Sequence, residues 1–389
     1  MSSKVIRRPR LRAASRVLAT SMAAATLISM SIVDAASAQS SSSSHYTIVY
    51  EGQLTGSANG APVAPEGPEA FKAAYAGKPV TVDICDDQGT TTGNIDCEHQ
   101  AVIDHAAAFV VTQSNEDQSL LDSANIPVIG TANDTSPQSF DVSAQQGFFA
   151  GMAVALHNHG CKRLGTIVVE GGQSYVEQTI KAEHWQSVTN AVVPLAAPDL
   201  SPDIAKLQQA NVQCIAMATI GPEIQQALQA IHQAKLKVPV AMPGIVVTPQ
   251  VQSSLGSLGN GLILVESTPA LSSSSVAEAA KKMHAANKGI LVDSNSIAIW
   301  ALALILQDGA ANVKGQVTNT SLLAALNKLR NASTDGLYPP LSMKPQSNPA
   351  ATRDFDTYVQ TDTLENGKLT QPSSWLNVGP EINVALTNS

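Results

Sequence analysis

The chain has 389 residues, a formal net charge of −8 at pH 7 and four cysteines. This length exceeds one comfortable hydrophobic core, so two domains are expected. An acidic chain without a basic patch argues against nucleic acid or anionic lipid as a partner.

The first 38 residues have the composition of an export signal. Six Lys and Arg residues within the first 16 positions precede the apolar segment Val17–Val33, and Ala36–Ala38 supplies small residues for cleavage. We therefore expect cleavage near Ala38, a flexible leader over residues 39–45, and a mature protein that is periplasmic or secreted. The alternative is a retained membrane anchor, but the segment is short for a span and contains several Ser and Thr residues.

Removal of the signal takes away six of the 23 Lys and Arg residues and one of the 31 Asp and Glu residues. That leaves 17 cations against 30 anions, a net charge of −13. The other strongly apolar run, Ile297–Leu306, is too short to cross a bilayer and is typical of a buried helix. We therefore expect a soluble, monomeric mature protein.

Residues 46–140 predict a first block of alternating strands and helices. Apolar strands separated by helices are typical of a parallel sheet covered on both faces. We expect strands at Thr47–Tyr50, Pro79–Ile84, Ala106–Val111 and Ile126–Gly130, with helices at Pro68–Tyr75, around Glu98–His105 and after Asn115.

Small polar residues follow two strands of this block. In open parallel sheets, ligands bind outside the carboxyl ends of the strands. These residues therefore predict a ligand-binding site, and no catalytic set accompanies them. The candidates are Thr112, Ser114 and Asn115 after one strand, and Thr131, Ala132, Asn133 and Asp134 after the next.

A second block with the same alternation covers residues 141–267. Neither block opens its first helix with a glycine-rich phosphate fingerprint, so a nucleotide site is unsupported and we expect no cofactor. We expect helices at Ala144–His157, after Tyr175, at Asp203–Asn211 and at Pro222–Ala234, with strands at Leu164–Val169, Ala191–Leu195, Cys214–Thr219, Val238–Met242 and Gly261–Val265.

The rest of the chain returns to both blocks. Asn366-Gly367 between strand-like runs is a tight hairpin signal. Helices are expected around Ser275–Ala286, Ser296–Leu306 and Thr320–Leu329.

These elements predict an α/β fold with two doubly wound parallel-sheet lobes. The first lobe would comprise residues 46–140 plus 268–335, and the second residues 141–267 plus 336–389. Several crossovers between the lobes would form a multi-strand hinge, and hinge closure around a ligand is a known mode of motion.

An even number of cysteines in an exported chain indicates disulfides. Cys85 ends a strand and Cys97 lies in the helix after it, while Cys161 and Cys214 stand at the beginning of two strands that could be neighbours. Of the three possible connectivities we favour Cys85–Cys97 with Cys161–Cys214.

The run His157-Asn158-His159-Gly160-Cys161 has two readings. It could be a cluster of metal ligands, but a helix end with Gly160 as its cap explains it better. We therefore predict no metal site.

Together these residues resemble the type I periplasmic solute-binding proteins of ABC transporters, specifically the branched-chain amino-acid (leucine/isoleucine/valine) binding subfamily. The resemblance runs from about Tyr46 to about Thr370 and rests on the order and spacing of several short pieces. These pieces are Asp86-Asp87-Gln88, Phe109–Asn115, Ile126–Thr131, Gly165–Glu170 with Gln173-Ser174-Tyr175, Ile220–Glu223, Ser296–Leu306 and Glu365–Lys368.

The resemblance implies a periplasmic binding protein fold, no enzymatic activity, and delivery of a bound small molecule to an ABC transporter permease. It implies that Ser114 and residues 131–134 hold the ligand from the first lobe with hydroxyl and backbone N–H groups, which suit a carboxylate. Tyr175 would cover the ligand from the second lobe, and Gly221 and Glu223 would approach from the same side.

Amino-acid binders of this family place an acidic residue after the next strand, where it pairs with the ligand's ammonium group. Here that stretch is Met242-Pro243-Gly244-Ile245 and contains no acid. An unpaired buried ammonium would be costly. Either Glu223 or Asp134 supplies the charge, or the ligand is another small carboxylate, such as an aromatic or branched acid.

Two other functions remain open from the sequence. A sensor subunit, which reports ligand closure to a membrane receptor, would have the same pattern. An exported hydrolase would need a nucleophile with its base, and the chain has no Gly-x-Ser-x-Gly elbow or metal-ligand helix. Some of these residues also have a purely structural interpretation: Thr112 and Ser114 could cap a helix, Tyr175 could lie on the surface, and Glu51 could be a solvated loop acid.

Overall fold

The computed structural model describes residues 45–55, 66–112, 118–132, 135–142, 145–169, 179–180, 185–194, 199–219, 221–349, 351–370 and 372–382. The expected export signal, and the leader up to residue 44, lie outside these ranges, so both stay predictions. Within the described ranges, no helix has the length and apolar character needed to cross a membrane.

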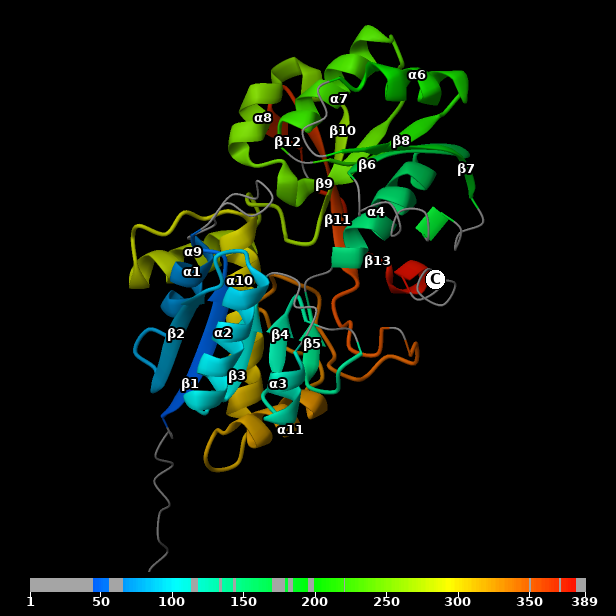
Figure 1. Cartoon of the computed structure of the whole chain (residues 1–389). Helices are drawn as coiled ribbons and strands as arrows, with labels where there is room; N and C mark the ends of the chain where they lie inside the picture. Colours follow the sequence, from blue (N-terminus) through cyan, green and yellow to red (C-terminus); the bar gives the residue numbers. More distant parts are fainter. Residues whose placement is uncertain are drawn as a thin grey trace, which may run out of the picture. The chain divides into compact units, whose positions relative to one another are not determined.

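The first sheet is parallel throughout and has the strand order β2-β1-β3-β4-β5 (Figure 1). β5 was not predicted, because three residues with polar ends carry no alternating pattern over a useful length. The strands are β1 Tyr46–Gly52, β2 Val80–Asp86, β3 Ala108–Val111, β4 Val128–Gly130 and β5 Ser139–Asp141.

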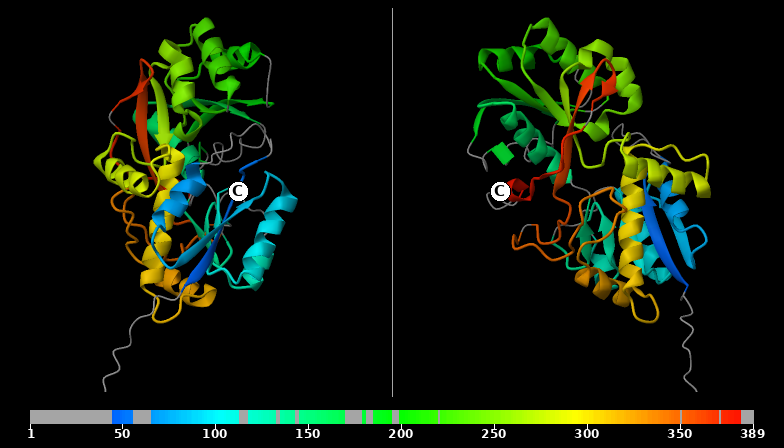
Figure 2. Two further views of the ribbon diagram at one scale, coloured as in Figure 1. Left: turned by 90° about the vertical axis from the view of Figure 1, so that its left-hand side faces the viewer. Right: turned by 180° about the vertical axis from the view of Figure 1, so that it is seen from behind.

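Helices cover both faces of this sheet (Figure 2). Successive side chains of a strand point to opposite faces, so Ile48 and Tyr50 enter one hydrophobic cluster and Val49 enters another. The first cluster includes α1 Glu66–Ala74, α9 Ser274–Ala286, α10 Ser294–Ala311 and α11 Asn319–Lys328, and the second includes α2 Thr91–Ile103 and α3 Ser119–Ser123.

Helix α2 begins seven residues before the predicted stretch. Thr90 caps it by accepting a hydrogen bond from the Gly93 backbone N–H at 3.0 Å. Gly93 is required there, because a Cβ at this position would lie 2.0 Å from the Asp87 carbonyl oxygen. The run Thr90–Asn94 has the composition of a turn, and the cap and the close contact with Asp87 make it helical instead.

The second sheet has the order β12-β11-β10-β9-β8-β6-β7, with β13 paired to β11. The strands from β6 to β10 are parallel, whereas β11 runs antiparallel to β10 and turns into β12 at Asn366-Gly367, which confirms the hairpin. The strands are β6 Arg163–Val169, β7 Gln186–Val193, β8 Cys214–Ala218, β9 Val240–Pro243, β10 Leu262–Glu266, β11 Tyr358–Glu365, β12 Lys368–Leu369 and β13 Leu376–Asn377.

One large hydrophobic cluster joins this sheet to its helices. Helix α4 approaches closely at Gly151, where a Cβ would lie 2.7 Å from Val265 Cγ1 and 2.9 Å from Val359 Cγ2. Among the described residues, the other helical elements are α4 Gln145–Asn158, α6 Ser201–Gln209, α7 Pro222–Gln233, η2 Gly244–Val246, α8 Pro249–Leu255 and η3 Gly256–Gly259. The mixed α/β architecture with parallel sheets confirms the predicted fold class.

More of the chain after α11 packs against the first sheet than was predicted. Leu337, Leu341 and Phe355 belong to the same buried cluster as Ile48 and α10. Asp141 of β5 forms an isolated bridge with Asp354, and the backbone N–H of Phe355 donates to the Asp141 carbonyl oxygen at 2.8 Å. The return to the second sheet therefore follows Phe355 rather than residue 335, and the finer division into lobes stays a prediction.

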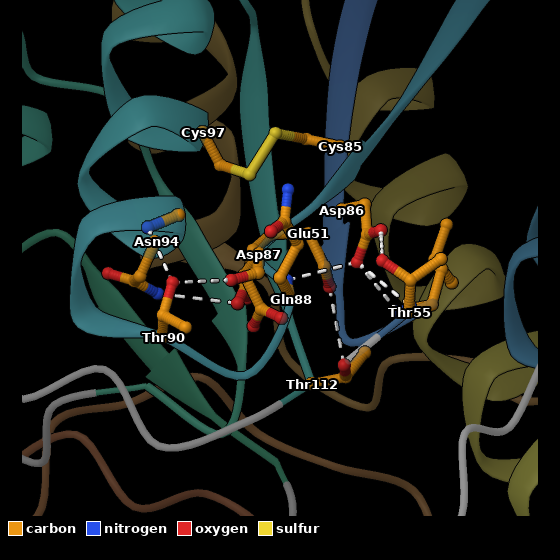
Figure 3. The surroundings of a disulfide bond; sticks show 12 residues. Glu51, Thr55, Cys85, Asp86, Asp87, Gln88, Thr90, Asn94, Cys97 and Thr112 are labelled. Carbon is orange, nitrogen blue, oxygen red and sulfur yellow. Dashed lines mark hydrogen bonds between the residues drawn. A yellow bond between two sulfur atoms is a disulfide. The ribbon is translucent and has the colours of Figure 1, made fainter. Parts of the chain in front are cut away.

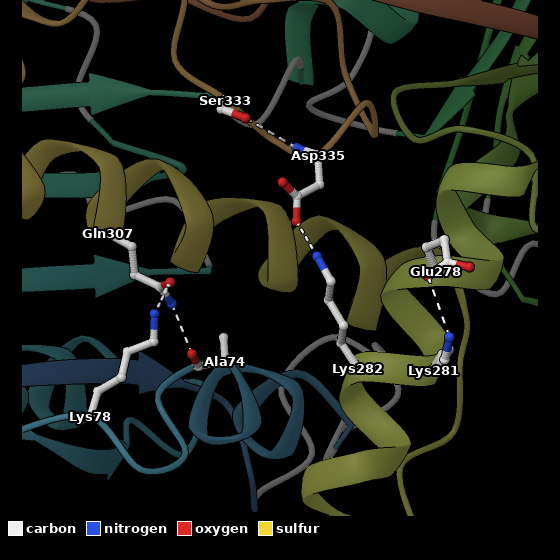
Figure 4. A network of polar contacts seen from close by, with 8 residues as sticks. All are labelled: Ala74, Lys78, Glu278, Lys281, Lys282, Gln307, Ser333 and Asp335. Atoms are coloured by element: carbon white, nitrogen blue, oxygen red, sulfur yellow. Dashed lines mark hydrogen bonds and ion pairs between the residues drawn. The ribbon is translucent and has the colours of Figure 1, made fainter.

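Exposed polar contacts also join the elements around the first sheet (Figure 4). Lys282 of α9 forms an ion pair with Asp335 at 2.6 Å, and Lys78 donates to the Gln307 side chain of α10. Both partners of the ion pair are about half exposed, so it contributes little to stability. Buried apolar side chains such as Leu337, Leu341 and Phe355 therefore hold the segment after α11 in place.

The four cysteines form two disulfides in the structure. Cys85 at the end of β2 is bonded to Cys97 of α2, with Cα atoms 5.6 Å apart. Cys161 and Cys214 precede β6 and begin β8, which are neighbours, and their Cα atoms are 6.1 Å apart. The connectivity is the one favoured from the sequence.

Candidate functional site

The carboxyl ends of β1, β3 and β4 lie next to one another in the first sheet. The residues that follow these three strands therefore share one edge of the sheet. They include Gln53 after β1, Thr112 after β3, and Thr131 with Ala132 after β4. Of the candidates predicted for this edge, Thr112, Thr131 and Ala132 are described, and they do lie together along it.

This edge offers hydrogen-bond donors that the described residues leave unused. The Thr131 backbone N–H donates to the Val111 carbonyl oxygen at 3.0 Å, which fixes the end of β4. The Thr131 hydroxyl and the Ala132 N–H have no partner in the described part of the chain. The Gln53 Nε2 is buried and likewise has no partner there. Buried donors are normally paired, so the Gln53 amide suits a bound acceptor, and the Thr131 hydroxyl and the Ala132 N–H offer further donors along the same edge.

Gly130 sets the position of these donors. Its φ is +123°, and a Cβ there would lie 2.0 Å from the Val111 carbonyl oxygen. Only glycine lets the end of β4 approach β3 this closely. The close contact between Gly130 and Val111 therefore fixes the backbone that carries Thr131 and Ala132.

Thr112 uses its own donor within the sheet. Its hydroxyl donates to the Glu51 carbonyl oxygen at 3.2 Å, so only acceptor lone pairs remain for a ligand. The geometry therefore supports a role for Thr112 in joining the ends of β1 and β3, and its contact with a ligand stays a prediction.

Glu51 is fully buried, so the interpretation of this residue as a solvated loop acid is wrong. It lies within β1, and its Oε1 accepts a hydrogen bond from Asn94 Nδ2 at 3.3 Å. Burial, followed by the neighbouring Asp87, raises the pKa of Glu51 to about 9. Glu51 is consequently neutral at pH 7 and adds no negative charge to this edge.

The adjacent Asp86 has a structural role (Figure 3). Its carboxylate accepts hydrogen bonds from the backbone N–H groups of Leu54 at 2.9 Å, Thr55 at 3.1 Å and Gln88 at 3.0 Å, and from the Thr55 hydroxyl. Partial burial opposes ionisation, but these bonds hold the pKa of Asp86 below its usual value. The Asp86-Asp87-Gln88 turn thereby ties the chain after β1 to the end of β2.

The end of β8 presents a second set of polar groups. Gly221 has a φ of +57° and precedes α7, and the Glu223 Oε2 lies 3.6 Å from where a Gly221 Cβ would be. Glu223 is only 4% exposed and stands in the first turn of the helix, where the dipole stabilises an acid. The geometry thus gives Glu223 a local role, and its predicted contact with a ligand ammonium remains untested.

Three residues of the second sheet were not identified from the sequence. The Thr219 hydroxyl, after β8, is buried without a partner among the described residues. Glu266 ends β10 with its carboxyl group directly over Gly244, and Gln360 of β11 pairs with Glu266 across the strands. A polar residue ending an apolar strand was the available signal for Thr219 and Glu266, whereas the pairing with Gln360 appears only in the fold.

Five predicted site residues lie outside the described residues, namely Ser114, Asn115, Asn133, Asp134 and Tyr175. Their contacts with a ligand therefore stay predictions.

The described residues contain no cluster of side chains that could hold a metal ion. His157 stacks on Trp185 with ring centroids 4.6 Å apart, and Gly160 follows α4 with a φ of +86°. The helix-end reading of the run His157–Cys161 is therefore supported.

Residues 55–361 match the periplasmic binding protein family. The chain belongs to this family. Proteins of the family are exported, non-enzymatic solute-binding proteins that bind small molecules and work with ABC transporter permeases. The resemblance to periplasmic solute-binding proteins is thereby confirmed.

Solved structures share the fold of this periplasmic binding protein. An ABC transporter substrate-binding protein from Sphaerobacter thermophilus superposes with a TM-score of 0.72 at 17% identity, covering 87% of this chain and 99% of that one. A leucine-binding protein from Thermotoga maritima gives 0.66 at 14% identity, covering 85% and 99%. A solute-binding protein from R. palustris in complex with benzoate gives 0.65 at 17% identity, covering 84% and 94%. No curated protein matches the chain in sequence.

Proposed function

We propose that this periplasmic binding protein captures a small carboxylate-bearing molecule between its two lobes and delivers it to an ABC transporter permease. The acid group of the ligand binds at the carboxyl edge of the first sheet. The ligand is a branched-chain amino acid or another small organic acid.

The unused donors on the first sheet carry the proposal. The Ala132 N–H, the Thr131 hydroxyl and the Gln53 amide are neutral donors at the ends of β4 and β1, in the part of a parallel sheet where ligands bind. Neutral donors at a strand end hold a carboxylate through charge-assisted hydrogen bonds. The neutral state of Glu51 at pH 7 also removes a repulsion that an ionised neighbour would impose on an anion.

Proteins with the same fold add support. The R. palustris proteins were solved in complex with benzoate and with 4-hydroxybenzoate, and the Thermotoga maritima protein is a leucine-binding protein. Each of these ligands carries a carboxylate, although the rest of each molecule differs. The common acid group is the feature that the first-sheet donors of this chain fit.

A thermal-shift screen tests the ligand class. The panel contains amino acids, aromatic acids, short peptides, amides and sugars. A ligand at about 100 times its Kd stabilises the folded protein by ~2.7 kcal/mol, which gives a clear shift in Tm. We expect carboxylates among the hits. If only sugars or uncharged amides raise the Tm, the carboxylate assignment is wrong.

Two variants test the site itself. Thr131→Val keeps the shape of the side chain but removes the hydroxyl, and Gln53→Leu removes the buried amide donor. Each should weaken binding of a carboxylate hit roughly fivefold or more, because a hydrogen bond to a charged group is lost. Thr320→Val, on the exposed surface of α11, is the matched control and should leave affinity unchanged. Equal affinity in all three variants would contradict the assignment of the acid group to this edge.

Two further variants, Ser114→Ala and Tyr175→Ala, test candidates from the sequence. Both should weaken carboxylate binding without lowering the stability of the ligand-free protein. A binding constant that neither change affects would remove these two residues from the site.

A further inference from the structure

We propose that the Glu51 carboxyl group donates its proton to the Asp87 carboxylate, and that this hydrogen bond positions the carboxyl edge of the first sheet for an anion. Loss of the proton at alkaline pH then weakens anion binding. The inference rests on the proposed function and adds regulation by pH to it. Three features carry it: the contact between two buried acids, the lack of a cation around them, and the elements that they join.

The two acids are buried and in contact. Glu51 is fully buried in β1, Asp87 directly follows β2 and is 3% exposed, and their carboxyl groups lie within hydrogen-bond distance of each other (Figure 3). Two ionised carboxylates in contact repel each other, and burial makes each charge more costly. One proton between the two groups removes the repulsion.

The other hydrogen bonds of the pair leave one oxygen of each acid for this proton. Glu51 Oε1 accepts from Asn94 Nδ2 at 3.3 Å, whereas Glu51 Oε2 receives no hydrogen bond from an N–H or hydroxyl group of the described residues. Asp87 Oδ1 accepts from the Gly89 backbone N–H at 2.7 Å. A protonated Glu51 is the donor that a second oxygen of Asp87 can accept.

No cation of the surrounding elements competes with the proton. The strands β1, β2 and β3 and the helices α2 and α3 contain no Lys or Arg. Of their titratable side chains, only that of His99 can become positively charged, and it is exposed. The titratable side chains nearest to the pair along these elements are Tyr50, Asp83, Asp86, Asp96, Glu98 and His99.

The pair also joins three elements at the edge of the sheet. The Asp87 backbone N–H donates to the Gly52 carbonyl oxygen of β1 at 3.3 Å, and the Asp87 carbonyl oxygen accepts from the Thr90 N–H at 3.0 Å, where α2 begins. Gln53, one of the proposed ligand donors, directly follows Gly52. Glu51 and Asp87 are therefore positioning residues, which act through Gln53 rather than on the ligand itself.

Ionisation of Glu51 disturbs this edge in a defined pH range. Burial, followed by the hydrogen bond and the charge of Asp87, raises the pKa of Glu51 to about 9. The folded protein therefore keeps the proton at pH 7 and loses it as the pH rises through about 9. Above that pH, two negative charges meet beside the donors that are proposed to hold an acid group, so an anion is repelled.

Infrared spectroscopy tests the shared proton without a ligand. At pH 7 the spectrum of the wild type minus that of Glu51→Gln should contain the carbonyl band of a protonated carboxylic acid. Labelling of glutamate with ¹³C should shift this band, and raising the pH to 10 should reduce it. The buried acids Glu266 and Asp356 are common to both proteins, so their bands cancel. Absence of the band at pH 7, or a band that does not respond to pH, overturns the proposal.

Titration with benzoate and with 3-methylbutanoate tests the effect on binding, because neither acid changes its charge between pH 7 and pH 10. The affinity of the mature wild type should fall up to about tenfold per pH unit above the pKa of Glu51. Asp87→Asn should move this fall to lower pH, because Asp87 helps to raise that pKa.

Glu51→Gln is the conservative variant, because its amide can still donate to Asp87 but cannot ionise. It should lower the affinity at pH 7 by no more than a few fold, and the fall at alkaline pH should disappear. The matched control is Glu365→Gln, which changes an exposed acid at the end of β11 and should keep the pH dependence of the wild type.

The outcomes separate the two proposals. If the wild type and Glu51→Gln lose affinity equally with pH, the inference is wrong and the carboxylate function stands. If neither acid binds at any pH and only sugars or amides do, the carboxylate function and its regulation by pH both fail, and the infrared band alone decides whether the proton is shared. Circular dichroism and Tm of the ligand-free variants establish that they are folded.

Discussion

Replacing Glu51 by Gln should make the stability of this protein less dependent on pH. Glu51 is fully buried in β1, and burial together with Asp87 raises its pKa to about 9, whereas in the unfolded chain it ionises near its ordinary value of 4.5. The folded state therefore favours the neutral acid. The stability that the neutral acid provides is complete below about pH 4.5 and is lost as the pH rises towards 9.

The size of the effect follows from the difference between the two pKa values. Each pH unit between them costs the wild type about 1.4 kcal/mol, so between pH 5 and pH 7 it loses roughly 2 to 3 kcal/mol. The amide introduced by Glu51→Gln cannot ionise, and its oxygen can still accept the hydrogen bond from Asn94. Other buried acids, such as Glu266 and Asp356, contribute equally to both proteins, so the difference between them isolates Glu51.

Urea unfolding at pH 5, 6 and 7 measures this difference. The free energy of unfolding of Glu51→Gln, relative to the wild type, should increase by roughly 2 to 3 kcal/mol across that range. Glu365→Gln changes an exposed acid and should track the wild type. A difference between Glu51→Gln and wild type that stays constant with pH would refute the reasoning, since Glu51 would then be ionised in the folded state.

Three further results are expected. Mass spectrometry of the unreduced mature protein should find no free thiol, and four alkylated cysteines without reduction would contradict both pairings. The Cys85–Cys97 bond closes a loop of 12 residues, so its loss should destabilise the fold by ~3 kcal/mol. Small-angle scattering should show a smaller radius of gyration when a tightly binding ligand is added, and an unchanged curve would count against hinge closure. Gly130→Ala should destabilise the protein by at least about 1 kcal/mol more than the control Gly315→Ala. Both glycines have a positive φ, but only at Gly130 would a Cβ meet backbone atoms; equal losses of stability would mean that β4 can move away from β3.

The long apolar elements could be predicted from the sequence because their pattern extends over many residues. The strands β1, β3 and β10 and the buried helix α10 are of this kind. Elements set by capping or by an edge position were harder to recognise. β7 begins at Gln186 rather than at Ala191, because a strand at the edge of the sheet tolerates polar residues. α8 begins at Pro249; Thr248-Pro249 has the composition of a turn, but Thr248 caps the helix by accepting a hydrogen bond from the Val251 backbone N–H.

The candidate site was predictable where sequence order determines position. Thr131 and Ala132 follow a strand directly, so their place at the edge of the first sheet could be expected. Glu266 and Gln360 are far apart in sequence, and they meet only because β11 returns antiparallel beside β10. Composition and spacing carry no information on that pairing, so the acid near Gly244 looked absent.

A crystal structure of the mature protein with its tightest-binding ligand would test the central claim most directly. We predict a small carboxylate whose acid oxygens lie within hydrogen-bond distance of the Ala132 N–H and the Thr131 hydroxyl. A ligand whose acid group is bound elsewhere, or a ligand without an acid group at this edge, would contradict it.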